Sequence, residues 1–231
     1  MTQPSGSRFS SYFVLVVALF VTALVISNII AVKLVLVQGL VLPAGVVVFP
    51  LSYILGDVLT EVYGYGAARR VIWLGFLCNL LAVLAIWLGG LLPAAPFWGG
   101  QAAYDAILGT TPRLLLASFL AYLVGEFANA VIMSRLKVAM QGRHLWVRTI
   151  GSTLVGEGLD SAFFISIAFF DVLPPGVLIG TIVTQWLVKS AYEALATPLT
   201  YLVVGFLKRR EGVDVYDRQI RLNPFAIGKE G

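Results

Sequence analysis

Long uncharged apolar runs constrain what this chain can fold into more than any other feature of its sequence. The first run covers residues 9–32, which are 24 residues between Arg8 and Lys33 without a charged side chain. A helix needs about 20 apolar residues to cross the hydrocarbon core of a bilayer, and it pairs its backbone groups internally, as lipid requires. The run is longer than the apolar region of a signal peptide, and no small-residue cleavage site follows it. We therefore expect a retained first transmembrane helix.

The composition agrees with lipid as the main solvent of this chain. Only 12% of the 231 residues are charged and 59% are hydrophobic, whereas soluble domains carry about 25% charged residues. The single cysteine, Cys78, excludes a disulfide framework within the chain and argues against a cysteine metal site. The sequence contains no nucleotide-binding P-loop, no zinc-protease motif and no hydrolase nucleophile motif. We expect no cofactor, no metal and no enzymatic activity.

Six segments are long and apolar enough to be membrane-spanning helices. Glycines, prolines and charged residues set their boundaries. The predicted spans are 11–31, 44–63, 71–92, 114–134, 150–172 and 177–207. The last is about 31 residues long, so we expect it to be tilted, broken or extended into the cytoplasm. The segment 34–42 is too short to span and is interrupted by Gly39, so we expect a hairpin or an interfacial loop there.

The distribution of basic residues predicts the orientation of these spans. Six spans place both termini and the second and fourth loops on one side, which holds Arg69-Arg70, the basic loop 135–148 and the basic tail. The opposite side holds only Lys33 and Arg113. Because cytoplasmic loops are enriched in lysine and arginine, both termini should be cytoplasmic. We expect an all-α membrane protein with three parts: a cytoplasmic tail (1–10), a six-helix transport domain (11–207) and a second cytoplasmic tail (208–231), partly disordered beyond Asn223.

Seven ionisable residues lie inside the predicted spans, where charge is unfavourable. Placing a charged side chain at the centre of a bilayer costs about 2.5–3.5 kcal/mol, so such residues usually face the bundle interior, pair with one another or line a substrate path. Glu126, Asp160 and Lys189 lie near mid-depth. The seven are Asp57, Glu61, Glu126, Glu157, Asp160, Lys189 and Glu193.

Simpler structural explanations exist for some of these charges. Lys189 and Glu193 are four residues apart and share a helical face, so a structural ion pair is one alternative. Glu61 lies near a helix end and is explained by capping, or by pairing with Arg69 or Arg70. One lysine does not neutralise the remaining acids. Either some of them are protonated, or a cationic or hydrogen-bond-donating ligand completes the site.

Short motifs surround these charges along the chain. They are Ser27-Asn28 with Lys33, Phe49-Pro50-Leu51, Asp57, Thr60-Glu61-Val62-Tyr63-Gly64-Tyr65, Ala68-Arg69-Arg70-Val71-Ile72-Trp73, Gly125-Glu126-Phe127-Ala128-Asn129, Ser134-Arg135-Leu136-Lys137, Arg148-Thr149-Ile150-Gly151-Ser152-Thr153, Gly156-Glu157, Asp160-Ser161, Lys189, Tyr192-Glu193 and Thr197-Pro198. In this order, from about Val14 to Asp217, the chain resembles the queuosine precursor transporter family, formerly described as a vitamin-uptake family. The resemblance implies a secondary transporter of the bacterial inner membrane that imports 7-cyano-7-deazaguanine or its aminomethyl relative for queuosine salvage.

The chemistry of such a ligand suggests roles for the buried polar residues. A deazaguanine presents an N–H and an amino group on one edge, and one carboxylate can accept both hydrogen bonds. Glu126 or Asp160 is the expected acceptor, Asn129 or Gln185 would pair with the ring carbonyl, and an aromatic ring such as Trp186 would stack on the ligand. The predicted substrate-binding residues are Glu126, Asp160, Asn129, Asp57, Asn28, Gln185, Lys189 and Glu193.

Other classes of function stay open at this point. A chain of this size also suits a substrate-binding membrane subunit that needs a separate energising module. A membrane enzyme is disfavoured because the sequence shows no metal triad or nucleophile–base pair, and a purely structural role is disfavoured by the unbalanced buried acids. The expected partners are a small molecule and the lipid bilayer, with no nucleic acid. Six helices make a thin bundle, so a homodimer is also plausible.

Overall fold

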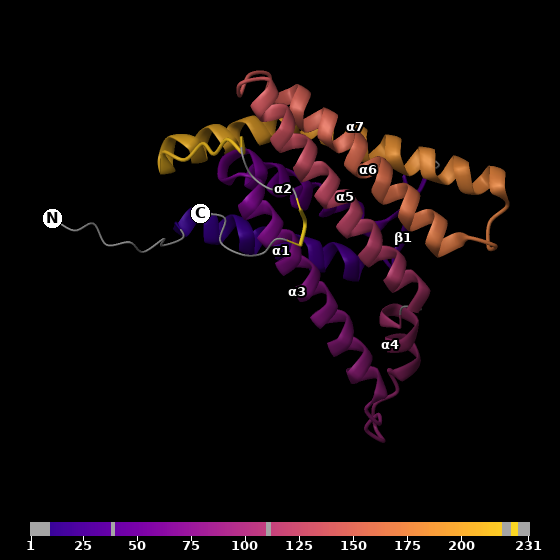
Figure 1. Ribbon diagram of the computed structural model, residues 1–231. Helices are drawn as coiled ribbons and strands as arrows, with labels where there is room; N and C mark the ends of the chain where they lie inside the picture. Colours follow the sequence, from indigo (N-terminus) through magenta and orange to yellow (C-terminus); the bar gives the residue numbers. More distant parts are fainter. Residues whose placement is uncertain (1–9, 38–39, 110–111, 219–222, 226–231) are drawn as a thin grey trace.

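The computed structural model describes residues 10–37, 40–109, 112–218 and 223–225, and these are predominantly helical (Figure 1). They form seven α-helices, one short 3-10 helix (η1) and one two-stranded hairpin. In chain order the elements are α1 (Ser11–Ile30), β1 (Leu34–Val37), β2 (Leu40–Pro43), η1 (Ala44–Val47), α2 (Phe49–Tyr63), α3 (Tyr65–Leu91), α4 (Gln101–Leu108), α5 (Pro112–Ala139), α6 (Leu145–Phe169) and α7 (Pro175–Glu211).

Four stretches are long and apolar enough to cross a membrane. They are α1, α3, the stretch Gln101–Ala139 that contains α5, and α6. Helix α2 has only 15 residues, and the 37-residue α7 carries charged side chains along its length. The chain is therefore a multi-pass helical membrane protein.

Several element boundaries differ from the sequence-based expectation for clear local reasons. The apolar segment 34–42 forms a hairpin, with Leu34 opposite Pro43 and Val37 opposite Leu40. The predicted span 44–63 begins with η1, and its α-helix starts only at Phe49, with a proline in its first turn. Helix α3 begins at Tyr65 rather than Val71. The chain reverses at Gly64, whose φ of 80° favours glycine, and helix resumes directly afterwards. Helix α4, in the loop before α5, was not expected.

Helix α2 occupies the centre of the molecule. It packs against α1, α3, α5 and α7, and eleven of its fifteen residues are buried. Helices α5, α6 and α7 lie side by side, with α6 between the other two, and α5 and α7 contact α2 (Figure 1). The two charged residues of α2, Asp57 and Glu61, are 1% and 0% exposed. Helix α2 therefore carries both carboxyl groups into the core.

Glycines bring α5 and α6 close together. A Cβ on Gly125 would lie 2.9 Å from the Cβ of Asp160 and 3.0 Å from the carbonyl oxygen of Gly156. A Cβ on Gly156 would lie 2.8 Å from the Cβ of Asn129. Small residues at a helix crossing allow the backbones to approach in lipid. The same contacts place polar side chains of the two helices next to each other.

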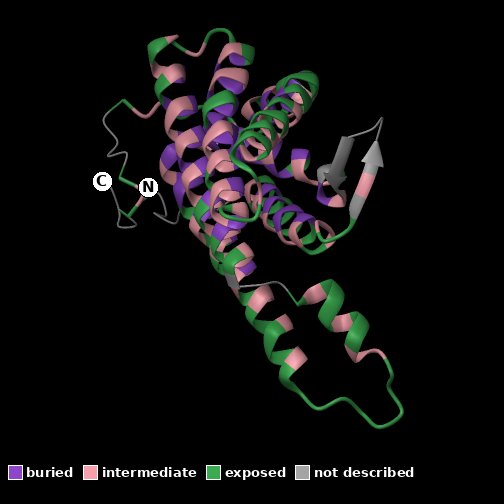
Figure 2. Cartoon of the chain, turned by 90° about the vertical axis from the view of Figure 1, so that its right-hand side faces the viewer, coloured by how far each residue is buried: buried purple, intermediate pink, exposed green. Residues whose placement is uncertain are grey.

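The outer surface is largely apolar. The part of α3 after Asn79 and all of α4 extend away from the helical body and contain no buried residue (Figure 2). Leu81 is 67% exposed, Leu91 63% and Trp87 59%. Water would penalise such a surface, whereas the acyl chains of a bilayer solvate it.

The segment after α7 packs against the body of the protein. The backbone N–H of Val215 donates to the carbonyl of Val62 at 3.1 Å. The Oδ2 atom of Asp217 accepts from the first backbone N–H of α3, that of Tyr65, at 2.8 Å, and from the hydroxyl of Ser134 at 2.7 Å. Part of the predicted second tail therefore belongs to the folded core. The predicted first tail lies outside the described residues except for Ser10, as does the expected disorder beyond Asn223 except for Pro224 and Phe225.

Replacing Asp217 should destabilise the protein through the start of α3. Asp217→Ala removes the side-chain acceptor at the first backbone N–H of α3, and the loss of a capping residue costs about 0.5–2 kcal/mol. We expect a lower midpoint of thermal unfolding in detergent for this variant. Asp217→Asn keeps an acceptor oxygen and should lose less. An Asp217→Ala protein as stable as the wild type would contradict the capping role.

Candidate functional site

A cavity of about 170 Å³ lies among helices α1, α2, α5, α6 and α7. One buried water needs about 10–15 Å³ by a comparable measure, so the cavity is large enough for a small organic molecule. Its polar lining side chains are Asn28, Tyr53, Ser118, Tyr122, Glu126, Asn129, Thr153, Glu157, Asp160, Gln185 and Lys189. Six of the eight predicted substrate-binding residues therefore meet at one cavity.

An ion-pair group forms one wall of the cavity. The Nζ atom of Lys189 on α7 lies 3.0 Å from Oε2 of Glu157 on α6 and also contacts Oδ2 of Asp160. The ammonium lies 5.3 Å from the ring centroid of Phe49. The alternative of a structural Lys189–Glu193 pair is wrong. Although the two residues share a helix, the lysine reaches the acids of the neighbouring α6 and holds two carboxylates in place.

Glu126 provides a carboxylate at the cavity surface that forms no ion pair with the described cations. Its side chain is 6% exposed and lines the cavity from α5, and it forms no hydrogen bond or ion pair with any described residue. Gly56 leaves space for it, because a Cβ on that glycine would lie 3.3 Å from Oε2 of Glu126. Its neighbours at the cavity surface include Tyr122, whose hydroxyl donates to the carbonyl of Ile72. The acceptor capacity of Glu126 is therefore available to a ligand.

Asp57 and Glu193 lie behind the cavity wall rather than in it. Asn129, which lines the cavity, donates from Nδ2 to Oδ1 of Asp57 at 2.8 Å. The other oxygen of Asp57 and Oε1 of Glu193 are buried without a partner among the described residues. Glu193 is 2% exposed and interacts electrostatically with Asp57. These two predicted site residues therefore do not line the cavity and lie behind residues that do.

Aromatic rings complete the cavity lining, but Trp186, the ring that the sequence suggested, is not among them. The lining includes Phe49, Tyr53, Tyr122 and Phe164. The indole N–H of Trp186 instead donates to the carbonyl of Leu154 at 2.8 Å, and Trp186 does not line the cavity, so its predicted stacking role is wrong. Aromatic residues are common in all the spans, and nothing in their spacing distinguishes these four.

The two remaining predicted amides also reach the cavity. Asn28 on α1 donates from Nδ2 to Oδ1 of Asn79 on α3 at 3.2 Å. Gln185 on α7 has a buried Oε1 without a partner among the described residues. Glu157 is a cavity residue that the predicted set omitted, although the sequence already marked it as a buried acid.

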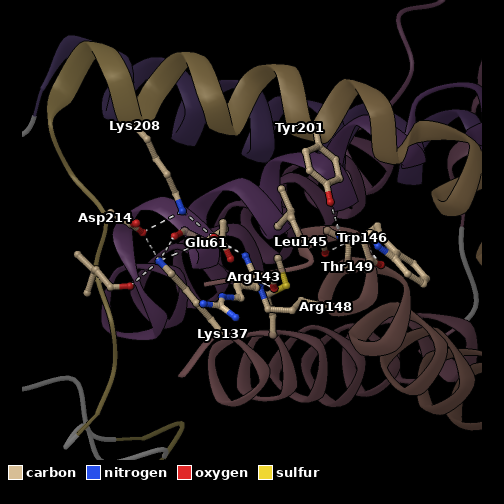
Figure 3. A network of polar contacts seen from close by, with 12 residues as sticks. Glu61, Lys137, Arg143, Leu145, Trp146, Arg148, Thr149, Tyr201, Lys208 and Asp214 are labelled. Atoms are coloured by element: carbon tan, nitrogen blue, oxygen red, sulfur yellow. Dashed lines mark hydrogen bonds and ion pairs between the residues drawn. The ribbon is translucent and has the colours of Figure 1, made fainter. Parts of the chain in front are cut away.

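A second charged cluster joins the far ends of α2, α5, α6 and α7 (Figure 3). Oε1 of Glu61 lies 2.7 Å from Nη2 of Arg148 and 2.7 Å from Nζ of Lys208. Lys137 lies 3.9 Å from the same oxygen and donates to Oδ1 of Asp214. Asp214 is also 2.9 Å from Nζ of Lys208. We call these five residues the Glu61 cluster.

The Glu61 cluster corrects one sequence-based expectation. Glu61 does not pair with Arg69 or Arg70, because the turn at Gly64 directs α3 away from the end of α2. Arg69 donates to the carbonyl of Asn223 at 2.9 Å, and Arg70 donates within its own helix.

The electrostatics of Asp214, outside the helices, fit its place in this cluster. Partial burial alone would raise the pKa of the Asp214 carboxyl. Hydrogen bonds from Lys137 and Lys208 outweigh that effect and hold the pKa below its ordinary value. Asp214 is thus an anion that contacts two cations directly.

Neutralising Glu61 should unfold or loosen the protein. Removing one partner of a buried ion pair leaves uncompensated charge and costs about 3–5 kcal/mol. We expect Glu61→Gln to reduce the monodisperse fraction that survives heating in detergent, measured by size-exclusion chromatography. Asp105→Asn is the matched control, because Asp105 accepts only an exposed hydrogen bond from Gln101 on α4. Equal survival of the two variants would contradict a stabilising role for the cluster.

Comparison with known proteins gives one family. Residues 43–203 match the family described as "Putative vitamin uptake transporter". The "Probable queuosine precursor transporter" of Bacillus subtilis (strain 168) is 31% identical over 182 residues, which cover 78% of this chain and 79% of that protein. The "Queuosine precursor transporter" of Escherichia coli (strain K12) is 30% identical over 53% of this chain and 52% of its own length.

A third relative and the solved structures complete the comparison. The "Probable queuosine precursor transporter" of Haemophilus influenzae (strain ATCC 51907 / DSM 11121 / KW20 / Rd) is 28% identical over 57% of this chain and 53% of that protein. No solved structure matches this chain. The family match covers more than half of the chain, including α2 and most of the cavity lining. The chain therefore belongs to the family described as "Putative vitamin uptake transporter".

Proposed function

We propose that this protein imports a queuosine precursor, 7-cyano-7-deazaguanine or 7-aminomethyl-7-deazaguanine, across the bacterial inner membrane for salvage into tRNA. The names of three relatives supply the substrate class. The observation that carries the proposal is the free carboxylate of Glu126 in an aromatic-lined cavity. An acceptor of two hydrogen bonds beside flat apolar walls matches the edge and the faces of a deazapurine.

Glu126 is the better of the two expected acceptors for the guanine edge. Asp160 is engaged by Lys189, whereas Glu126 has no competing partner among the described residues. A carboxylate that accepts from the ring N–H and the amino group forms two charge-assisted hydrogen bonds. Gln185 suits the ring carbonyl better than Asn129, because the amide N–H of Asn129 already binds Asp57.

The remaining polar residues would hold the pocket in shape. Phe49 and Tyr53 lie on α2 beside Lys189, whose ammonium is 5.3 and 6.0 Å from their ring centroids. They would contact one face of the ligand. The Lys189 group of ion pairs would fix the α6–α7 wall, and Asn28 would fix the α1 wall. Asp57 and Glu193 would act on the pocket without touching the ligand.

We propose six crossings with both termini in the cytoplasm. Helix α2 is about 22 Å long at 1.5 Å per residue, less than the roughly 30 Å hydrocarbon core. The β hairpin and η1 would complete that crossing, and α7 would form the sixth and continue into the cytoplasm. In this arrangement the Glu61 cluster lies at the cytoplasmic end, and the cavity lies toward the opposite side. The domain limits at residues 10 and 207 belong to the same proposal.

Cysteine labelling tests this topology. In a Cys78→Ser background, Ala94→Cys should react with a membrane-impermeant maleimide in intact cells. Gln141→Cys should react only after permeabilisation, although both positions are exposed on the structure. The reversed pattern would contradict the orientation. Labelling of both from the same side would contradict an odd number of crossings between them.

Uptake measurements test the substrate and the role of Glu126. In a strain unable to make deazaguanines, the gene should restore tRNA queuosine when 7-cyano-7-deazaguanine is supplied externally. Hydrogen bonds to a charged group contribute about 1.5–3 kcal/mol each, so Glu126→Gln should reduce uptake at least tenfold at limiting substrate. Asp105→Asn should transport normally.

The outcome also separates a complete transporter from a binding subunit. The purified chain alone should transport the deazaguanine into liposomes. Binding without transport would indicate that a separate energising module is needed. Wild-type uptake by a correctly inserted Glu126→Gln protein would contradict the proposed acceptor.

A further inference from the structure

Five carboxyl groups and one lysine lie around the cavity in the part of the chain that the structure describes. An isolated charge in a low-dielectric interior is strongly unfavourable, so buried carboxylates are paired or take up a proton. One lysine offsets only one of five negative charges. The acids are Asp57 on α2, Glu126 on α5, Glu157 and Asp160 on α6 and Glu193 on α7, and the base is Lys189.

Three of these acids are already accounted for. Lys189 holds Glu157 and Asp160 in ion pairs. Glu126 faces the cavity, where the ligand would satisfy it. Asp57 and Glu193 are left, at 1% and 2% exposure. Each has a carboxylate oxygen that is buried without a hydrogen-bond partner among the described residues, and the helices that carry them, α2 and α7, pack against each other.

Asn129 connects this acid pair to the cavity. Its amide Nδ2 donates to Oδ1 of Asp57 at 2.8 Å, while its side chain also lines the cavity. An ionised Asp57 accepts this hydrogen bond more strongly than a protonated one. Protonation of Asp57 therefore changes how firmly Asn129 is held at the cavity surface. By linkage, ligand at that surface also changes the proton affinity of the acid pair.

We propose that Asp57 and Glu193 form a proton-binding pair and that proton entry drives inward transport of the ligand. The proposal goes beyond the proposed function and rests on it only for the identity of the cargo. A proton from the outer solution adds to a lone pair of a carboxylate oxygen, giving one neutral carboxyl group. After the ligand leaves, the same O–H bond releases its proton to cytoplasmic water. The cycle moves one positive charge inward with a neutral ligand.

The other charged and titratable groups near the pair do not offer an equivalent site. Glu61, one turn along α2, is neutralised by Arg148 and Lys208. Helix α1 carries no charged residue, and the basic residues of α3 contact the C-terminal segment or their own helix. From the other helices, Glu126 on α5 and Glu157 on α6 interact electrostatically with the pair. Tyr53, Tyr122, Asp160 and Lys189 lie beyond these two acids, at the cavity lining.

Proteoliposomes containing the purified full chain test the coupling. An inside-alkaline pH gradient should raise the initial uptake rate of radiolabelled 7-cyano-7-deazaguanine several-fold and allow accumulation above the external concentration. An inside-negative potential should also accelerate uptake, and a protonophore should abolish both effects. A sodium gradient alone should have no effect. Uptake that ignores the pH gradient, or that follows sodium, would overturn the proposal.

Variants locate the proton site. Asp57→Asn and Glu193→Gln should each lose most of the acceleration by the pH gradient. Both should still exchange labelled for unlabelled ligand, and this exchange would show that the variants fold and bind. Asp105→Asn should behave as the wild type. Acceleration that survives in both Asp57→Asn and Glu193→Gln would overturn the assignment of the site.

A measurement without ligand keeps the proton site separate from the cargo. Infrared difference spectra between acidic and alkaline buffers should show a carboxylic-acid C=O band that titrates in the wild type and is lost in the Asp57→Asn/Glu193→Gln double variant. With this band present and no deazaguanine uptake under any gradient, the cargo would be wrong and the proton site would stand. If the band is unchanged in the double variant, the proton site is wrong, whatever the cargo.

Discussion

The burial of helix α2 is the constraint on which the rest of the structure depends. This 15-residue helix is enclosed by α1, α3, α5 and α7, yet it carries two carboxylates one turn apart. Each carboxylate needs partners that α2 itself does not offer. Glu61 takes them from α6, α7 and the end of α5, and Asp57 takes an amide from the middle of α5. The contacts of Glu61 and Asp57 thus hold α5, α6 and α7 to α2.

The Glu61 cluster and the charged residues around the cavity differ in how their charges are paired. At the Glu61 cluster two anions meet three cations, and the contacts between them are direct. Around the cavity acids outnumber bases, and several oxygens have no partner among the described residues. A cluster in which each anion contacts cations directly favours one fixed arrangement of helices, whereas carboxylates in excess of the available cations are completed by ligands or protons. This contrast distinguishes the Glu61 cluster, where a stabilising role is expected, from the cavity, where ligand binding is proposed.

The sequence predicted the helical membrane fold class and six of the residues that line the cavity, because both follow from hydropathy. A buried acid in an apolar run is visible without a structure, and Glu126, Asp160 and Lys189 do meet at one cavity. Pairing is not visible in this way, because it depends on helix rotation. Lys189 reaches Glu157 and Asp160 instead of Glu193, and Glu61 reaches Arg148 instead of Arg69. The aromatic wall was missed because Phe49 and Tyr53 have no distinguishing pattern, and the folded role of Asp217 was missed because its partners are 152 and 83 residues away.

Helix α7 connects the two charged levels with one continuous backbone. Lys189 and Lys208 are 19 residues apart on it, about 28 Å at 1.5 Å per residue. Pro198 lies between them, and its missing N–H leaves the carbonyl of Ala194 without its helical partner. Bending is least costly at such a point. Lys189 and Lys208 therefore bind their acids on opposite sides of the residue at which α7 bends most easily.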